Sequence, residues 1–435
     1  MKTSIIPAEK PPTPSGRSTL RSLDHLARQL VHSLLNQIKI GQLTLADQGN
    51  RYTFGQPSDI FSLHPEITVH RPRFYRKALW GGSIGAAESY MSADWSADHL
   101  TDIMRLMVIN RHIFERMDTG WGRIMQPVYH WFHWLHKNTK IGSRANITAH
   151  YDLGNDFYQL FLDDTMTYSC GIFETDAATL EQASISKYDR ICRKLKLGPS
   201  DHVLEIGTGW GGFAIHAARH YGCRVTTTTI SPSQYEWAES RVAEAGLDER
   251  ITLLLADYRD LDGTYDKLVS IEMVEAVGHQ FLETFFRCCG RRLKPDGMMV
   301  LQAITIADSV YDRHKRSVDF IKRYIFPGSC IPSLTAMCQA MAQSTDLRVV
   351  HLEDLAPHYA RTLREWRRRF FDNLEQVREM GYSNTFVRMW EYYFCYCEGG
   401  FEERYLGDVQ LLITKPFCRS KPLLPVLNTD GQKYP

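Results

Sequence analysis

A short glycine-rich stretch carries the clearest chemical signal in this sequence. Residues 203–212 are VLEIGTGWGG. Gly207, Gly209 and Gly212 satisfy the dinucleotide spacing G-x-G-x-x-G, whereas Gly207, Gly209 and Gly211 satisfy G-x-G-x-G. Glycines clustered directly after a predicted strand favour a loop whose backbone approaches a ligand over a simple tight turn. The sequence therefore predicts a nucleotide-binding loop, and the two spacings predict different nucleotides.

The charges around this loop favour one of the two nucleotides. A dinucleotide site needs room for a pyrophosphate and usually an acidic residue about 20 residues later for the ribose. The second predicted strand ends in TTTTISPSQ, which contains no acid, and Glu205 would repel a pyrophosphate at short range. The same carboxylate suits a cationic ligand such as S-adenosylmethionine, which carries a sulfonium and an ammonium group. The pattern therefore favours a methyltransferase loop.

The elements that must position this loop alternate regularly between strand and helix. Strands are predicted at 202–207, 223–230, 251–257, 265–273 and 297–305, and helices at 212–221, 232–246 and 280–293. Such alternation is typical of a parallel sheet with right-handed crossovers, which binds ligands outside the carboxyl ends of its strands. We predict an α/β fold, a Rossmann-like class I methyltransferase with a central, mostly parallel sheet, preceded by a small α+β N-terminal domain.

The rest of the chain divides into shorter segments. Residues 1–18 are rich in proline and are predicted to be a disordered tail. Residues 19–125 begin with an amphipathic helix and a hairpin, and are predicted to form an α+β domain that binds lipid or mediates dimerisation; we favour a homodimer. We predict a linker at 126–149, a catalytic domain at 150–415 and a C-terminal tail at 416–435. For the aromatic stretch around His130 and His133, we prefer packing between domains to a metal or membrane site.

Composition restricts the class of protein. The chain has 51 Lys and Arg residues against 50 Asp and Glu residues, so a general attraction to nucleic acid is not expected. Its 10 cysteines lack the regular spacing of a disulfide framework or a zinc site, which favours reduced thiols in the cytoplasm. No signal peptide or membrane-spanning apolar run is evident. We expect a cytoplasmic protein that contacts lipid only at the inner membrane surface.

Several motifs together resemble the cyclopropane-fatty-acid synthases and the related mycolic acid methyltransferases. In chain order they are HYDLGNDFYQLFLDDTMTYSCGIF (150–173), EIGTGWGG, TTISPSQ, ADYRDL, IEMVEAVG, KRYIFPGSCIPS, PHYARTL and YYFCYCEGGF. They cover nearly all of residues 140–415, and the preceding region resembles the N-terminal domain of bacterial phospholipid-type members. The resemblance implies S-adenosylmethionine as cofactor. It also implies that a methylene unit is added to a cis double bond of an unsaturated acyl chain, giving a cyclopropane, and the expected carrier of this chain is a phospholipid.

Positions within these motifs implicate a set of cofactor-binding residues. Gly207, Gly209 and Gly211 would let the backbone approach the cofactor, with Glu205 beside them. The other implicated residues are Tyr168 and Ser169 at the methionine end, Thr229, Ser231 and Gln234 near the ribose, and Asp257, Tyr258 and Ile271 near the adenine. For Asp257 a helix cap is an equal alternative, because Asp often caps helices.

The resemblance further implies a bicarbonate ion as the base that removes a proton from the transferred methyl group. Its ligands would come from Cys170, Glu275, Ile304 and Tyr359. A carboxylate beside an anion implies a shared proton, which would make the bicarbonate a weak base. Cys397 matches the cysteine often assigned as the active-site residue. We expect Cys397 to line the pocket, because the reaction needs no covalent enzyme intermediate.

Two positions depart from the family pattern. Gln302 occupies a position where histidine is expected, and Ala276 one where many relatives carry histidine. Glutamine donates a hydrogen bond but cannot titrate, so proton removal would depend on bicarbonate and Glu275. The product is then a cyclopropane or a methyl- or methylene-branched chain, and the sequence leaves both open. A small-molecule methyltransferase and a non-catalytic lipid-binding protein are further alternatives.

Two other segments relate to lipid access. RTLREWRRRFF (361–371) places Leu363, Trp366 and Phe370 on one helical face and Arg364, Arg367 and Arg368 on the other. Such a face suits an anionic lipid surface, and an ordinary solvated helix is an equal alternative. PGSCIPS (327–333), with its glycine and prolines, is the candidate lid over the substrate.

Overall fold

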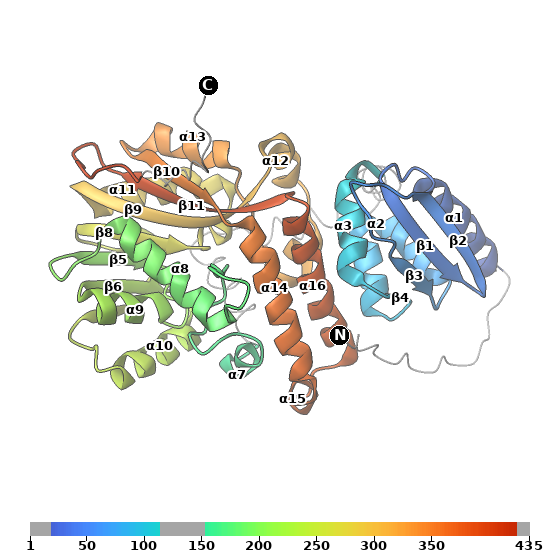
Figure 1. Cartoon of the computed structure of the whole chain (residues 1–435), viewed down its shortest axis with the longest axis horizontal. Helices are drawn as coiled ribbons and strands as arrows, with labels where there is room; N and C mark the ends of the chain where they lie inside the picture. Colours follow the sequence, from blue (N-terminus) through green and yellow to red (C-terminus); the bar gives the residue numbers. More distant parts are fainter. Residues whose placement is uncertain (1–18, 114–152, 424–435) are drawn as a thin grey trace, which may run out of the picture.

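The computed structural model describes residues 19–113 and 153–423 (Figure 1). The predicted tail at 1–18, the whole predicted linker at 126–149 with His130 and His133, and the end of the C-terminal tail lie outside the described residues. An N-terminal body, blue in Figure 1, lies beside a larger α/β body. Helix α16 (Asn384–Glu402) of the larger body packs against α2 (Arg73–Met91) and α3 (Leu100–Ile109) of the N-terminal body.

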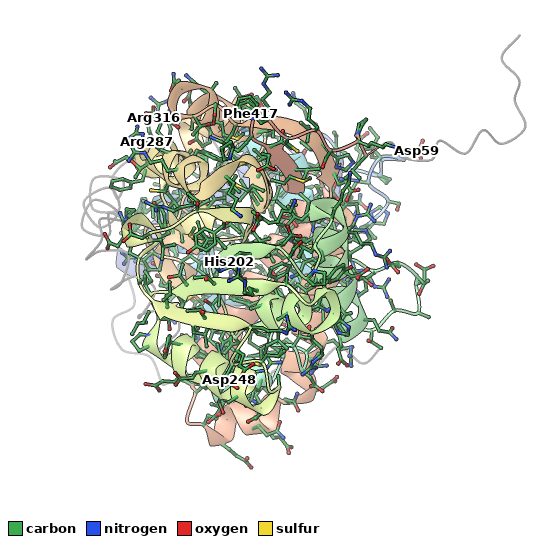
Figure 2. All side chains as sticks on the ribbon, turned by 90° about the vertical axis from the view of Figure 1, so that its left-hand side faces the viewer. Asp59, His202, Asp248, Arg287, Arg316 and Phe417 are labelled. Carbon is green, nitrogen blue, oxygen red and sulfur yellow. The ribbon has the colours of Figure 1, made fainter. Side chains whose placement is uncertain are left out.

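The larger body is built on a seven-stranded sheet in the order β10-β11-β9-β8-β5-β6-β7. Its strands are β5 (His202–Ile206), β6 (Arg224–Thr229), β7 (Ile251–Leu255), β8 (Tyr265–Ile271), β9 (Leu293–Ile306), β10 (Arg348–Asp354) and β11 (Leu406–Thr414). Strands β5 to β9 pair in parallel, which confirms the predicted mostly parallel sheet. The antiparallel strands β10 and β11 were not predicted. Figure 2 views this body from the amino end of β5, where His202 is labelled, so the carboxyl ends of the parallel strands lie on the far side.

Helices cover both faces of this sheet because successive strand residues point in opposite directions. In β9, Met298 and Val300 pack with α8 (Leu180–Leu195) and α9 (Gly212–Tyr221). Met299 and Leu301 pack on the other face with α11 (Leu282–Arg292) and α13 (Leu334–Ser344). The helices predicted at 212–221, 232–246 and 280–293 are present as α9, α10 (Pro232–Glu244) and α11.

The N-terminal body contains a four-stranded sheet in the order β2-β1-β3-β4. Its elements are α1 (Thr19–Leu35), β1 (Gly41–Asp47), β2 (Asn50–Gln56), β3 (Glu66–Val69), α2, β4 (Trp95–Ala97) and α3. The predicted hairpin is present as the antiparallel pair β1–β2. Helix α2 begins about one turn after β3 and is kinked at Gly82, whose φ of 58° is not helical.

Buried polar contacts join the two bodies. The Arg388 side chain on α16 is buried and donates hydrogen bonds to the backbone oxygens of Tyr90 (2.6 Å) and Trp95 (2.8 Å). Its guanidinium also lies 3.9 Å from the ring centroid of Tyr90. The Tyr90 hydroxyl in turn donates to Glu391 at 2.6 Å, and Thr101 donates to Glu398 at 3.0 Å. One arginine therefore satisfies two carbonyl groups of the neighbouring body.

We expect Arg388→Ala to lower the free energy of unfolding by about 3 kcal/mol, because two buried carbonyl groups lose their donor. The measurement is the midpoint of thermal unfolding followed by circular dichroism. Arg368→Ala is the matched control, since Arg368 on α14 (Ala356–Asp372) is half exposed and, among the described residues, pairs with Glu365 and Asp372 of its own helix. Its expected cost is below about 0.5 kcal/mol. Equal midpoints for the two variants would contradict the role given to Arg388.

Candidate functional site

A single cavity of about 1030 Å³ extends from the glycine loop into the N-terminal body. At one end it is lined by the carboxyl ends of β5, β6 and β8, where ligands of doubly wound sheets bind. Its middle is lined by side chains of α14 and α16, and its far end by side chains of α1, α2 and α3. The cavity therefore joins a nucleotide-type loop to the interior of a second body.

The glycine loop uses both of the spacings seen in the sequence, for different reasons. Gly207, Gly209 and Gly211 have φ angles of 103°, 53° and 88°, which side chains rarely adopt. Gly212 begins α9 with ordinary helical backbone, but a Cβ there would lie 2.5 Å from the hydroxyl of Tyr188. Three glycines therefore shape the turn, and the fourth lets α8 and α9 approach each other.

Glu205 ends β5 beside this loop and lines the cavity. Only 2% of the residue is exposed, and its Oε2 accepts a hydrogen bond from the hydroxyl of Thr227 at 2.6 Å. Burial raises the pKa of Glu205 to about 8, although Thr227 and the charge of Lys187 act in the opposite direction. A cationic ligand in the cavity would stabilise the ionised carboxylate.

The polar residues at the end of β6 bond mainly to one another. Thr229 and Gln234 line the cavity, and the Thr229 hydroxyl donates to the side-chain oxygen of Gln234 at 3.0 Å. Ser231 is buried and does not line the cavity. Instead its hydroxyl accepts a hydrogen bond from the backbone N–H of Gln234 and caps α10. Of the three expected ribose residues, the structure therefore brings two to the cavity.

The expected adenine residues Asp257, Tyr258 and Ile271 all line the cavity. Asp257 also caps the short helix at 258–260 and accepts hydrogen bonds from the Arg259 guanidinium at 2.7 and 2.6 Å. These contacts show that Asp257 caps a helix, as one of the two alternatives for this residue expected. Its ion pair with Arg259 leaves less negative charge for a ligand in this part of the cavity.

A second group of polar residues lies further along the cavity and centres on Glu272, which the sequence analysis did not single out. Oε1 of Glu272 accepts hydrogen bonds from the backbone N–H of Cys170 and from the side-chain amide of Gln302, both at 2.8 Å. Oε2 accepts one from the Tyr359 hydroxyl at 2.6 Å. The only signal in the sequence was a pair of carboxylates, Glu272 and Glu275, three residues apart at the end of a strand.

Glu275 lies beside Glu272 and also lines the cavity. Its Oε1 accepts the backbone N–H of Ile304, and its Oε2 has no hydrogen-bond partner within the described part of the chain. Burial, together with the charge of Glu272, raises the pKa of Glu275 to about 8. The candidate lid contacts this residue directly, because the backbone N–H of Cys330 donates to the Glu275 carbonyl at 2.9 Å, and its neighbours Ser329 and Ile331 line the cavity.

The two cysteines of the site differ in exposure, since Cys170 is buried and Cys397 is half-buried. Cys170 is completely buried and does not line the cavity, while Cys397 does line it. Burial raises the pKa of both thiols above the ordinary value. This agrees with the expectation that Cys397 lines the pocket and is not a nucleophile. Tyr168 and Ser169 also line the cavity, and Ser169 accepts a hydrogen bond from the Lys187 ammonium at 2.6 Å.

The donors that the resemblance assigns to bicarbonate are already used by carboxyl groups of this chain. The N–H of Cys170 and the hydroxyl of Tyr359 donate to Glu272, and the N–H of Ile304 donates to Glu275. Gln302 is completely buried, does not line the cavity, and directs its amide hydrogens to Glu272 and Asp408. The residues present therefore do not fit a bicarbonate ion in the expected position.

The arginines of α14 are largely neutralised by neighbouring residues. Arg364 pairs with Glu398 and Glu402 at 3.0 and 2.6 Å, and Arg367 pairs with Glu398 at 3.3 Å. The apolar residues of the same helix, Leu363, Trp366 and Phe370, lie in the core. These contacts weaken the interpretation of this helix as an anionic-lipid surface.

Residues 19–113 and 153–423 contain no group of three or more His, Cys, Asp or Glu side chains placed to hold a metal ion. Nor do they contain a helix with the length and apolar character needed to cross a membrane.

Comparison with known proteins agrees on one family. The family model for mycolic acid cyclopropane synthetase matches residues 138–411, which include both the glycine loop and Glu272. The chain is 38% identical to the tuberculostearic acid methyltransferase UfaA1 of Mycobacterium tuberculosis, over 80% of this chain and 82% of that protein. It is 36% identical to the cyclopropane-fatty-acyl-phospholipid synthase of Escherichia coli, over 80% and 86% of the two chains. The structure of mycolic acid cyclopropane synthase CmaA1 complexed with SAH and CTAB matches with a TM-score of 0.59 and 33% identity, over 62% of this chain and 98% of that chain. The class I methyltransferase fold is thereby confirmed.

We expect the affinity for S-adenosylmethionine to rise with pH between about 6 and 8, because the cationic ligand prefers the ionised form of Glu205, whose pKa is about 8 in the free protein. Glu205→Gln should bind about 10-fold more weakly at pH 8 and lose this pH dependence. Isothermal titration calorimetry measures both. Asp248→Asn, at an exposed residue labelled in Figure 2, is the control and should behave as the wild type. A pH-independent affinity of the wild type would contradict the role of Glu205.

Proposed function

Because this chain belongs to the mycolic acid cyclopropane synthetase family, we propose that it transfers a one-carbon unit from S-adenosylmethionine to the cis double bond of an unsaturated acyl chain and forms a cyclopropane. The family makes the chain an S-adenosylmethionine-dependent methyltransferase. The proposed substrate is an acyl chain of a membrane phospholipid. The observation that carries this proposal is the single cavity that joins the cofactor loop to the N-terminal body.

The N-terminal end of this cavity is lined mainly by apolar side chains, among them Leu35, Leu45, Ile67, Phe74 and Ile103. These residues come from α1, β1, β3, α2 and α3 and form part of the core of the N-terminal body. The whole cavity, at about 1030 Å³, lies at the upper end of the range of about 300–1,000 Å³ that small-molecule sites usually occupy. An extended acyl chain would cover the apolar lining, whereas a small polar substrate would leave it in contact with water. This supports lipid binding as a role of the N-terminal body.

The order of the residues along the cavity suits the proposed reaction. When bound, S-adenosylmethionine supplies an electrophilic methyl group to the alkene. Between the glycine loop and the apolar end lie the aromatic rings of Tyr168, Tyr359 and Tyr393, whose faces can stabilise a substrate carbocation by about 1–2 kcal/mol. Carboxyl groups that can accept a proton, Glu272 and Glu275, lie in the same part of the cavity. The surrounding buried apolar core excludes water from this cation.

A second candidate product is a methyl- or methylene-branched chain. It is favoured by the 38% identity to a tuberculostearic acid methyltransferase. Both products begin with the same methyl transfer and the same first cation. Direct loss of a proton from the transferred methyl group closes the ring, whereas a methylene branch requires a prior 1,2-hydride shift to the cation, and a saturated methyl branch requires a hydride donor as well. The residues that bind the cofactor and the acyl chain are therefore shared by the two candidates.

A substrate that stays in a bilayer requires the enzyme to work at a membrane surface. We include contact with the cytoplasmic face of the membrane in the proposal, with the apolar end of the cavity as the route for the acyl chain. The homodimer through the N-terminal domain stays a prediction.

Product analysis tests this proposal. The protein is incubated with methyl-labelled S-adenosylmethionine and vesicles of cis-unsaturated phospholipid, and the released acyl esters are examined by proton NMR. We expect an upfield cyclopropane signal, whereas olefinic methylene protons or a new methyl doublet would establish the branched product. Vesicles of saturated phospholipid are the control, because without a double bond no label should enter the lipid. Labelling of neither lipid by a protein that binds the cofactor would contradict the proposed substrate class.

A further inference from the structure

We propose that Glu272 is the base of this reaction, and that its side-chain carboxylate occupies the place of the bicarbonate ion implied by the family resemblance. This inference rests on the proposed function. It starts from the geometry of the donors. The N–H of Cys170 and the hydroxyl of Tyr359, two groups expected to bind the ion, converge on the Glu272 carboxylate at 2.8 and 2.6 Å. The amide of Gln302, at the position where histidine is expected, donates to the same carboxylate at 2.8 Å.

The backbone at Glu272 supports a functional role for this side chain. Its φ of 47° lies in the left-handed region, which favours glycine and costs other residues about 1–2 kcal/mol. The conformation is held by a hydrogen bond of 2.9 Å from the Glu272 N–H to the carbonyl of Gln302. A glutamate at such a position, with its carboxylate in the cavity, indicates that the carboxylate itself is needed.

The orientation of Gln302 follows from a chain of hydrogen bonds. The buried Lys194 ammonium donates to the side-chain oxygen of Gln410 at 2.7 Å, because an ammonium group cannot accept. The Gln410 amide therefore donates to the side-chain oxygen of Gln302 at 2.9 Å. This leaves the amide nitrogen of Gln302 facing Glu272. A residue that only donates is sufficient here, because Glu272 already supplies the negative charge.

The neighbouring carboxyl groups indicate which of them holds the charge. Asp408 is completely buried, and its Oδ1 has no hydrogen-bond partner in the described ranges. Glu275 likewise has one oxygen without a partner there. Glu272 accepts three hydrogen bonds, and hydrogen bonds to the ionised form favour that form. Burial raises the pKa of all three carboxyl groups, and the hydrogen bonds and the charge of Lys187 that oppose this rise are most numerous at Glu272. We therefore assign the negative charge to Glu272 and protons to Glu275 and Asp408.

The step conserves atoms and charge. After the methyl group has bonded to one alkene carbon, the positive charge lies on the other. Oε2 of Glu272, which accepts only the Tyr359 hydroxyl within the described residues, has a lone pair for one proton of the transferred carbon. The electron pair of that C–H bond forms the third bond of the ring. A methylene branch requires in addition a 1,2-hydride shift that first moves the charge to the methylated carbon, after which the same electron pair forms the double bond. Glu272 becomes a neutral acid and later releases the proton to water.

The first test is the dependence on bicarbonate. Transfer to cis-unsaturated phospholipid is measured in buffer freed of carbon dioxide and again with added sodium bicarbonate. The wild type should be equally active in both, and loss of activity without bicarbonate would overturn the proposal.

Glu272→Gln, which keeps the shape but not the charge, should form cyclic product at least about 100-fold more slowly. It should also divert the cation to methylated alkenes or alcohols, an outcome that a merely structural role would not produce. A Gln variant within a few-fold of the wild type would equally overturn the proposal.

Glu272→Gly tests whether a free bicarbonate ion can replace the missing carboxylate. Glycine adopts the left-handed backbone conformation of this position without strain, and its lack of a side chain leaves the hydrogen-bond donors around Glu272 available to the ion. Bicarbonate should restore its activity by about 10-fold or more, and should not restore Glu272→Gln, whose amide still fills the space. Activity of the glycine variant that bicarbonate leaves unchanged would contradict the shared position.

A lipid-free measurement separates this inference from the proposed function. Sodium bicarbonate should raise the midpoint of thermal unfolding of Glu272→Gly and leave that of the wild type unchanged, as mass action requires of an ion that binds only the variant. Sodium chloride at equal ionic strength is the control. If bicarbonate raises the unfolding midpoint of Glu272→Gly but the wild type labels no lipid, only the proposed substrate class is contradicted. If bicarbonate does not raise the midpoint of a folded Glu272→Gly variant that binds S-adenosylmethionine, the proposal that Glu272 occupies the bicarbonate position is overturned.

Discussion

The hydrogen bonds to the Glu272 carboxylate are the constraint on which the rest of the site depends. A charge buried beside an apolar cavity is stable only when it is bonded on several sides. Here the donors come from three separate parts of the fold: Cys170 before α8, Gln302 in β9 and Tyr359 in α14. The sheet holds them in register, since Gln302 lies opposite Gln410 in the antiparallel pair β9–β11. Strand β11 thus orients Gln302 through Gln410, a residue that does not itself line the cavity.

Helix α16 connects this site to the N-terminal body. One of its faces lines the cavity with Tyr393 and Cys397, and another holds the N-terminal body through Arg388 and Glu391. Docking of the N-terminal body and the shape of the apolar end of the cavity are therefore linked through one helix. This explains why an added body can extend a cofactor site that the sheet alone would leave open.

Several residues show why local patterns leave their role open. Ser231 follows the β6 strand as a ribose ligand should, but it caps α10, and Asp257 caps a short helix while it lines the cavity. The arginines of α14 form a basic stripe in sequence, yet carboxylates from α16 neutralise two of them. In each case a hydroxyl or a charge can serve two purposes, and the choice depends on neighbours that are distant in the chain.

The sequence by itself determined the features that depend on local interactions. Alternating strand and helix periods predicted the parallel sheet, and the glycine spacing with Glu205 predicted the cofactor loop, because turns and strand ends are set by nearby residues. The motifs also determined the family. Only the tertiary structure decided that Glu272, three residues from the expected Glu275, accepts the hydrogen bonds that the family resemblance assigns to a bicarbonate ion. The direction of its side chain depends on a left-handed backbone, and its partners lie 30 to 102 residues away in the chain. Contacts between residues that are distant in the chain depend on the packing of the whole fold, and no local sequence pattern specifies them.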